Sequence, residues 1–404
     1  MPNLLPYVVG AIYSTRVELL SSSDFSPVTL VLVAKTLRTF CYGFLGILLP
    51  VYLAEHGMDA QGVGLAMTCT LLGSAVLTWA VRRPAERLGA RAALGILVAL
   101  SALAAALLLA FDHPWVVVLA AMIGNVAVGT GETGPFLSIE QVVLTRAVAG
   151  QRRTTVLSVY NLLGYAAAGL GAAVVGLAAP RALFAVFLAV AIVQALLYAR
   201  LPGVPVTRAT SPAGTSSALI RRLAALFAVD SFAGGFVLQS LVAYFLHERY
   251  GLGLDVLGQI FLGAQLVTAA SLLLAARAAR RFGLLNTMVV SHLLSNVFLI
   301  AIAAAPGAWA AVVLLYARQL LSQMDVPTRQ AYVMAVVEDH EREAAATVTT
   351  LWRTVAQAIS PAVTGWVMAS VALAAPFVIG GGLKIVYDVV LWTTFKDVKP
   401  RELT

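Results

Sequence analysis

Charged side chains inside long apolar stretches are the residues of this sequence with the most distinctive chemistry. A charge at the centre of a membrane helix costs roughly 2.5–3.5 kcal/mol on insertion scales, so it is rarely retained without a partner or a role. Acids and bases in such a setting can bind a charged ligand, carry a proton or pair with each other. The residues concerned are Lys35, Arg38, Glu132, Glu140, Asp230, Arg318, Asp325, Arg329 and Arg353.

Helical spacing places some of these charges on common faces, because residues three, four, seven or eight apart lie on one side of a helix. Arg318, Asp325 and Arg329 are separated by seven and then four residues. They are therefore expected to form a stripe in which Asp325 and Arg329 can pair. The same reasoning puts Lys35 and Arg38 on one face, three residues apart.

We divide the charges by role from their predicted depth, at about 1.5 Å of rise per residue. Candidates for a substrate or proton pathway are Arg38, Glu132, Asp230, Arg318 and Asp325. Candidates for gates or ion pairs are Lys35, Glu140, Arg329 and Arg353, the first three between the two halves of the protein. An alternative for Arg38 is a structural ion pair with Glu132 or Asp230.

Other polar residues suggest local structure more than chemistry. Lys384 and Asp388, four apart, are expected to pair along one helix, and His292 is expected to be hydrogen-bonded in place. Neither a metal-ligand spacing nor a nucleophile–base pattern is found in the sequence, and it has no phosphate-binding loop ending in Lys-Ser/Thr. We therefore expect no cofactor, no metal, no enzyme activity and no hydrolysis of ATP.

The composition of the chain indicates which environment surrounds these charges. Hydrophobic residues make up 60% of the chain and charged residues only 11%, against roughly 25% charged in soluble domains. The mean hydropathy is +0.89. These values favour an all-α membrane protein. The net charge of +8 does not indicate a nucleic-acid partner, because the basic residues form short clusters between apolar runs.

Hydropathy predicts twelve spans of about 20 residues, six on each side of a link rich in Pro, Ser, Thr and Gly. The first six are 28–53, 62–81, 92–111, 115–143, 155–178 and 183–198. The second six are 219–246, 256–276, 285–305, 309–337, 347–371 and 376–395. The predicted organisation is a tail over 1–27, bundles over 28–201 and 219–396, a linker over 202–218 and a tail over 397–404.

Clusters of Lys and Arg predict the orientation, since positive loops stay in the cytoplasm. The clusters follow spans two, four, six, eight and twelve, which places them all on one side. Both termini and the linker are then cytoplasmic. We expect a multi-pass protein of the cell membrane, of the bacterial or archaeal inner-membrane type.

The two halves resemble each other in sequence. Phe40, Gly43 and Phe44 recur 192 residues later, and Arg38 and Asp230 occupy the same position of the repeat (230 minus 38 is 192). A duplicated apolar half is typical of membrane transporters, in which two bundles rock about a shared site.

The loops after spans two and eight carry a second repeat, with Gly89 matching Gly283. The first loop resembles the Gly-x-x-x-Asp-Arg-x-Gly motif of the major facilitator superfamily, with Glu in place of Asp. The residues that carry the motif and its echo are Glu86, Arg87, Gly89, Arg91, Arg280, Arg281 and Gly283. The resemblance implies two pseudo-symmetric six-helix bundles around a central cavity lined by spans one, four, seven and ten. These are the spans that carry most of the buried charges.

The resemblance also implies a secondary transporter that works by alternating access. We expect a monomer that moves a small molecule bearing both signs of charge, coupled to protons through Glu132 or Asp230. The turn from Asp325 to Arg329 is similar to the Pro-x-Arg turn of bacterial exporters and slightly favours export. The alternatives are a non-transporting sensor or scaffold with the same fold, and a lipid flippase.

Overall fold

The computed structural model describes residues 26–127, 134–148, 150–202, 218–337 and 342–396. Every regular element in this part of the chain is a helix, as the sequence predicts. Almost all of the predicted tails and of the linker lies outside the described residues, and so does Glu132.

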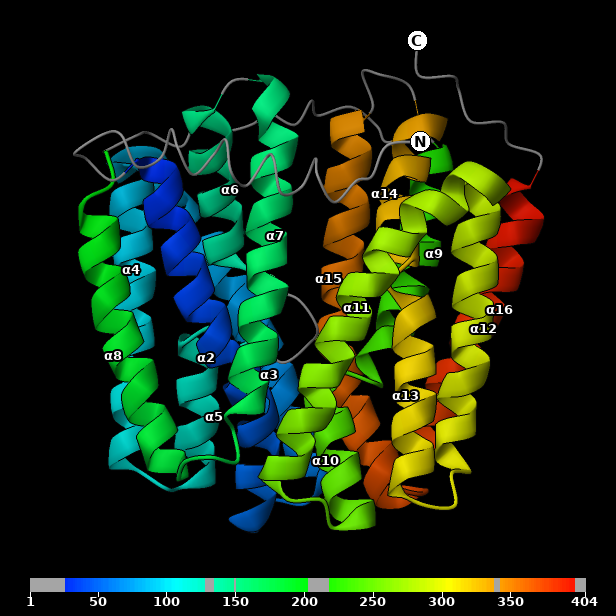
Figure 1. Cartoon of the computed structure of the whole chain (residues 1–404), viewed down its shortest axis with the longest axis horizontal. Coiled ribbons are helices and arrows are strands. Elements are labelled where there is room, and N and C mark those ends of the chain that lie inside the picture. The colour runs from blue at the N-terminus through cyan, green and yellow to red at the C-terminus, as the bar shows by residue number, and fades with distance from the viewer. Residues whose placement is uncertain (1–25, 128–133, 149, 203–217, 338–341, 397–404) are drawn as a thin grey trace.

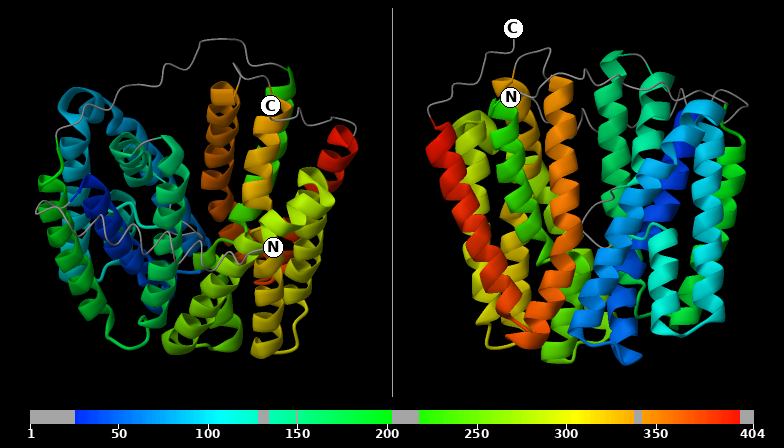
Figure 2. Two further views of the ribbon diagram at one scale, coloured as in Figure 1. Left: turned by 45° about the horizontal axis from the view of Figure 1, so that its top comes forward. Right: turned by 180° about the vertical axis from the view of Figure 1, so that it is seen from behind.

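The helices form two groups that follow the chain order, with α2–α8 on one side and α9–α16 on the other (Figure 1). The first group consists of α2 (Pro27–Glu55), α3 (Ala60–Ala80), α4 (Arg82–Ala110), α5 (Pro114–Ile123), α6 (Pro135–Ala147), α7 (Gly150–Ala173) and α8 (Pro180–Ala199). The second consists of α9 (Ala218–Gly235), α10 (Gln239–Tyr250), α11 (Leu254–Phe282), α12 (Leu284–Ala303), α13 (Ala308–Ser322), α14 (Asp325–Val336), α15 (Arg342–Ser370) and α16 (Ala375–Phe395). The view from behind shows the same division (Figure 2).

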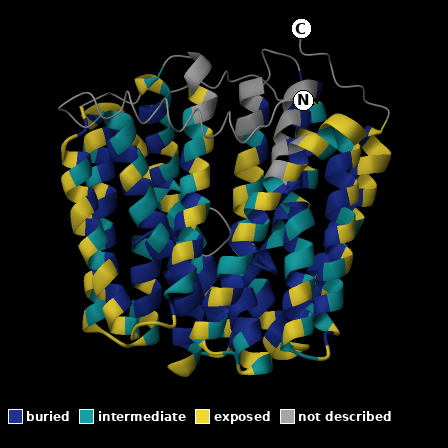
Figure 3. Ribbon diagram, viewed as in Figure 1, coloured by how far each residue is buried: buried dark blue, intermediate teal, exposed yellow. Residues whose placement is uncertain are grey.

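Length and apolar composition fit a bilayer. Within the described residues, nine helical segments are long and apolar enough to cross a membrane, and α5 and α13 are shorter apolar helices. Large apolar side chains are exposed on the outside of the bundle, among them Trp79 (70% exposed) and Trp309 (72%). Figure 3 shows such exposed positions along the full height of the outer helices. An apolar outer surface of this extent is suited to lipid.

Three of the predicted spans are not continuous helices. The span predicted over 115–143 is interrupted between α5 and α6, where Asn125 has φ 52° and Gly134 has φ 113°. Both are left-handed conformations that suit Asn and Gly. Pro135 then starts α6. The spans over 219–246 and 309–337 are interrupted between α9 and α10 and between α13 and α14. Broken helices in a membrane protein expose backbone where a site is built.

Small residues let the two groups touch at the face away from the start of α2 and the end of α16. A β-carbon on Gly64 of α3 would lie 2.7 Å from Cα of Gly365 of α15. A β-carbon on Gly258 of α11 would lie 2.5 Å from the carbonyl oxygen of Ala172 of α7 and 2.9 Å from Cγ1 of Val175. The Ser240 hydroxyl of α10 donates to the carbonyl of Gly46 of α2 at 2.6 Å. We call these contacts the outer seal.

The duplication is visible in backbone geometry. Gly89, inside α4, has φ 85° and ψ 171°. Gly283, between α11 and α12, has φ 82° and ψ 162°. The two loops therefore turn in the same left-handed way, which only glycine adopts without strain. Their charged motif residues Glu86, Arg87, Arg91, Arg280 and Arg281 are all exposed.

A smaller polar contact lies beside the outer seal, in the loop between α4 and α5. Asp112 accepts hydrogen bonds from the Tyr52 hydroxyl at 2.9 Å and from the Arg181 guanidinium at 3.0 Å. The hydrogen bond from Tyr52, followed by the positive charge of Arg181, lowers the pKa of the Asp112 carboxyl.

Candidate functional site

Asp230 of α9 is the centre of a buried charge network in the second half. Its Oδ1 accepts a hydrogen bond from Lys384 Nζ of α16 at 2.6 Å, and its Oδ2 lies 3.4 Å from Arg329 Nη1 of α14. All three side chains are less than a tenth exposed. Because each unpaired buried charge would be costly, the carboxylate is held between two bases that come from two other helices.

A histidine and a second aspartate lie behind this centre. His292 Nδ1 of α12 is 2.8 Å from Asp388 Oδ1 of α16, and His292 Nε2 is 3.6 Å from Asp230 Oδ1. Asn296 donates to Asp388 Oδ2 at 3.0 Å. The imidazole thus bridges two carboxylates, one in the centre of the network and one further from it.

Arg329 also pairs with Asp325 one helical turn earlier, which confirms the predicted pairing along the helix. The interruption before α14 places Asp325 in the first turn of that helix, where an acidic side chain suits the helix dipole. Arg318, predicted in one stripe with these two residues, lies on the separate helix α13.

Arg318 and Arg353 differ from Arg329 and Lys384, because their hydrogen-bond partners among the described residues are neutral. Arg318 Nη1 donates to Gln319 Oε1 at 3.1 Å, and its buried Nε has no hydrogen-bond partner among the described residues. Arg353 Nε of α15 donates to Ser231 Oγ at 2.9 Å. Among the described residues, no carboxylate lies within salt-bridge distance of either guanidinium.

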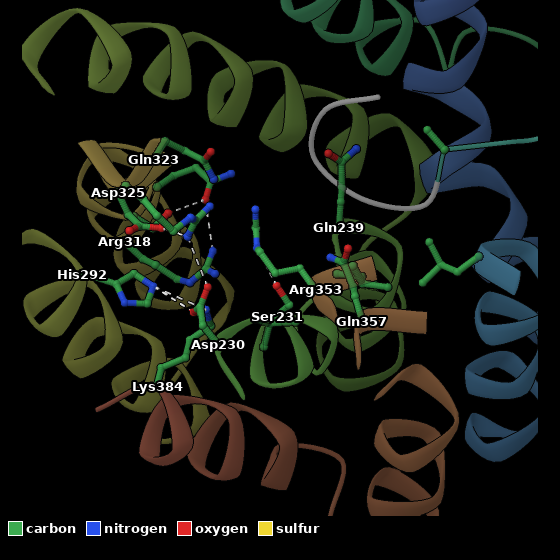
Figure 4. A pocket seen from close by; sticks show the side chains of 18 of the residues that line it. Asp230, Ser231, Gln239, His292, Arg318, Gln323, Asp325, Arg353, Gln357 and Lys384 are labelled. Carbon is green, nitrogen blue, oxygen red and sulfur yellow. Dashed lines mark hydrogen bonds and ion pairs between the residues drawn. The ribbon is translucent and has the colours of Figure 1, made fainter. Parts of the chain in front are cut away.

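These groups line a cavity of about 210 Å³ between the two groups of helices. Figure 4 shows Asp230, His292 and Lys384 together at one side of it, with Arg353 beside Ser231. The second half supplies every ionisable side chain among the described lining residues: Asp230, His292, Arg318, Asp325, Arg329, Arg353 and Lys384. The first half supplies Leu71, Ser74, Asn125, Val126 and Ala127.

The first half has its own charge cluster, which lies outside the cavity lining. Arg38 of α2 forms a two-pronged ion pair with Glu140 of α6, at 3.0 Å and 2.6 Å. Both Glu140 oxygens also accept hydrogen bonds from tyrosines, Tyr160 of α7 at 2.6 Å and Tyr198 of α8. The Phe136 ring lies 4.3 Å from the guanidinium carbon. Arg38 and Glu140 are 1% and 0% exposed.

The positions of Arg38 and Asp230 differ from the sequence-based expectation. Both were expected in the substrate or proton pathway, with an ion pair between them as an alternative, but Arg38 pairs with Glu140 and Asp230 with Lys384. Glu140 was expected to join the two halves, and its recorded partners instead lie in its own half. The pairing follows helix packing, because the bases that pair with Glu140 and with Asp230 come from the same group of helices as the acid.

Other expectations also need correction. The local pair expected between Lys384 and Asp388 is wrong, because Lys384 binds Asp230 and Asp388 binds His292. Arg329, expected as an inter-half gate, has its recorded ion pairs within the second half. The gate role of Lys35 stays a prediction; its side chain is 3% exposed and lies over the Tyr160 ring, 4.5 Å from the centroid. His292 is hydrogen-bonded, as expected, but to the charge network.

Comparison with known proteins agrees with this architecture. A model of the Major Facilitator Superfamily matches residues 31–317 and 223–404. The chain belongs to the major facilitator superfamily. It is also 25% identical to an uncharacterized membrane protein of Saccharomyces cerevisiae, over 90% of this chain and 92% of the yeast protein.

Solved structures of superfamily transporters share the fold. The nucleoside transporter NupG superposes with a TM-score of 0.72 at 15% identity, covering 92% of this chain and 99% of NupG. A D-xylose–proton symporter gives 0.72 at 15% identity, covering 93% and 99%. A peptide transporter of the POT family gives 0.74 at 10% identity, covering 94% and 98%. These three transporters are named for different substrates, a nucleoside, D-xylose and a peptide, so the shared fold does not select one.

Proposed function

We propose that this protein is a secondary transporter that moves a small polar molecule across the cell membrane by alternating access. The observation that carries the proposal is the charged cavity between two similarly built halves. The helices of major facilitator transporters are arranged in the same way. A site between two bundles can be exposed to each side in turn when one bundle rocks against the other.

The proposed topology has twelve spans, in bundles over 28–201 and 219–396, with both termini and the linker in the cytoplasm. The basic loops support this orientation. With that orientation, the outer seal of Gly64, Gly365 and Gly258 closes the extracellular side. The structure then represents a state closed to the outside. The protein would act as a monomer in a cell membrane of bacterial or archaeal type.

We further propose that transport is coupled to protons. Asp230 supports this role, because it lies in the cavity lining and is linked through His292 to Asp388. A proton entering this network changes the charge next to the substrate position, which would link the two binding events. Glu132, the other acid expected in this role, lies outside the described residues. The direction of transport, proposed as export, rests on the sequence of the turn at Asp325.

Proteoliposomes with an imposed pH gradient test the function. A panel of small metabolites and drugs is screened for gradient-driven flux, with Asp230→Asn as the variant and Glu248→Gln, an exposed acid outside the cavity lining, as the matched control. We expect at least one compound to be driven by the gradient, Asp230→Asn to abolish the driven flux and Glu248→Gln to retain it. The proposal fails if no compound in the panel is driven by the gradient.

A further inference from the structure

We propose that the cavity binds a small organic anion, whose carboxylate or phosphate is held by Arg318 and Arg353. The inference rests on the proposed transport function and names the class of molecule transported. It replaces the expectation of a substrate bearing both signs of charge.

The charges of the described lining residues do not balance. The bases among them are Arg318, Arg329, Arg353 and Lys384, and the acids are Asp230 and Asp325. Leaving His292 out of the count, four bases minus two acids give an excess of two positive charges among the described residues. A low-dielectric cavity with an excess of one sign attracts a ligand of the opposite sign.

The acids are already neutralised by two of the bases. Lys384 and Arg329 both contact Asp230, and Arg329 also contacts Asp325. A cationic substrate would have to displace one of these ion pairs. Asp325 Oδ1 has no hydrogen-bond partner among the described residues, so it can accept a hydrogen bond from a ligand hydroxyl.

The two remaining bases are the ones with neutral partners. Among the described residues, Arg318 donates one side-chain hydrogen bond, to Gln319, and Arg353 donates one, to Ser231. A guanidinium has five N–H donors in a planar fork, so most donors of each residue remain for a ligand. This fork matches a carboxylate or a phosphate in a two-pronged arrangement. The geometry therefore favours an anionic group at this position.

The volume of the cavity and its other lining residues limit the size and the further functional groups of the anion. The cavity volume of about 210 Å³ lies below the roughly 300–1,000 Å³ of sites for drug-sized ligands. The amide side chains of Gln239, Gln323 and Gln357 also line it, and they both donate and accept hydrogen bonds. A small anion with hydroxyl groups fits these features better than a bulky apolar anion.

Matched probes of opposite charge test this inference on the full-length protein. The anions are L-lactate, D-glucuronate and glycerol 3-phosphate, which separate carboxylate from phosphate recognition. Their neutral counterparts are lactamide, D-glucose and glycerol, and choline serves as the cation. Thermal stabilisation of the purified protein reports binding, and flux into proteoliposomes reports transport. We expect at least one anion to bind and to be transported, and its neutral counterpart to do neither.

Variants of the two arginines connect the result to the site. Arg318→Gln and Arg353→Gln should each raise the half-saturating concentration of the anion at least about tenfold, the loss of a charge-assisted hydrogen bond. Arg318→Lys and Arg353→Lys keep the charge without the fork and should give smaller increases, which also shows that the fold survives substitution. Arg277→Gln, at an exposed position of α11, removes the same charge outside the cavity lining and should change nothing.

The outcomes separate this inference from the transport function. A neutral or cationic compound that is transported in preference overturns the anion inference and leaves the transporter intact. Failure of all three anions to bind, or an affinity unchanged in both Gln variants, also overturns it. An anion that binds through Arg318 and Arg353 but is never transported supports the site and contradicts the transport function.

Discussion

The two halves of this protein use buried charge in opposite ways. In the first half, Arg38 and Glu140 form one two-pronged pair enclosed by tyrosines, outside the cavity lining. In the second half, Asp230 shares Lys384 and Arg329 in a network that lines the cavity. Arg38 and Asp230 occupy the same position of the sequence repeat. Equivalent positions of the two halves therefore carry charges with different surroundings.

We interpret the first cluster as the one that holds its half together and the second as the one that binds the ligand. The Arg38 pair joins α2, α6, α7 and α8, and its hydrogen bonds leave little capacity for a ligand. The second-half network has more bases than acids in the cavity and two guanidiniums with neutral partners. We therefore expect substitutions in the first cluster to reduce stability and substitutions in the second to reduce transport.

The largest effect is expected for Glu140→Gln. The substitution leaves Arg38 buried without a carboxylate, and breaking one side of a buried pair costs roughly 3–5 kcal/mol of stability. Thermal or denaturant unfolding of the purified protein measures the loss. Glu86→Gln, at an exposed position, is the matched control and should have little effect. Equal stability of the two variants would show that the Arg38 pair is not a structural clamp.

The next largest effect is expected for Asp230→Asn. This substitution should reduce transport more than stability. We expect flux to fall at least about tenfold, because a charge-assisted contact of 1.5–3 kcal/mol is lost at the site. Lys384 and Arg329 line the cavity and can then bind water, so the loss of stability should be smaller than for Glu140→Gln. A variant that transports normally but unfolds easily would place Asp230 with the structural residues.

These outcomes bear on how much the sequence could predict. The membrane class, the family and the Asp325–Arg329 pair follow from composition, motifs and spacing, which are local properties of the chain. Spans seven and ten, two of the four predicted to line the cavity, supply Asp230, Arg318, Asp325 and Arg329 to its lining. Span one supplies none of the described lining residues, and His292, Arg353 and Lys384 come from spans nine, eleven and twelve.

The partners of the buried charges could not be predicted in the same way. Arg38 and Glu140 are 102 residues apart, and Asp230 and Lys384 are 154 residues apart. Only the packing of separate helices brings them together, and a single sequence contains no signal for that choice. Lys384 and Asp388 share a helix face by spacing, yet α16 packs against both α9 and α12, so each residue finds a closer partner on another helix.

A moderate effect on pH dependence is expected for His292→Asn. The imidazole of His292 lies between the carboxylates of Asp230 and Asp388, so its removal breaks the link between them. We expect the variant to keep its fold while the dependence of flux on pH between about 5 and 8 flattens. The measurement is flux at a series of symmetric pH values. An unchanged pH profile would remove His292 from the coupling network.

The smallest effect is expected at Asp112, next to the outer seal. Its pKa is lowered in the folded state by the hydrogen bond from Tyr52 and by Arg181. A lowered pKa means that the contact stabilises the fold above the unfolded-state pKa of about 3.9 and is lost as the pH falls through the folded-state pKa. The melting temperature of Asp112→Asn should therefore be slightly below wild type at pH 7, and the difference should shrink in acid. A difference that grows in acid would contradict this sign.

The most direct measurement compares two double substitutions in proteoliposomes, with gradient-driven flux of a transported anion as the readout. Arg38→Gln with Glu140→Gln neutralises the first cluster, and Asp230→Asn with Lys384→Gln neutralises the second by the same number of charges. Our account predicts that the first double variant, once folded and reconstituted, transports at a rate near wild type, whereas the second loses flux. Loss of flux only in the first, or equal flux in both, would contradict the assignment of transport chemistry to the second half.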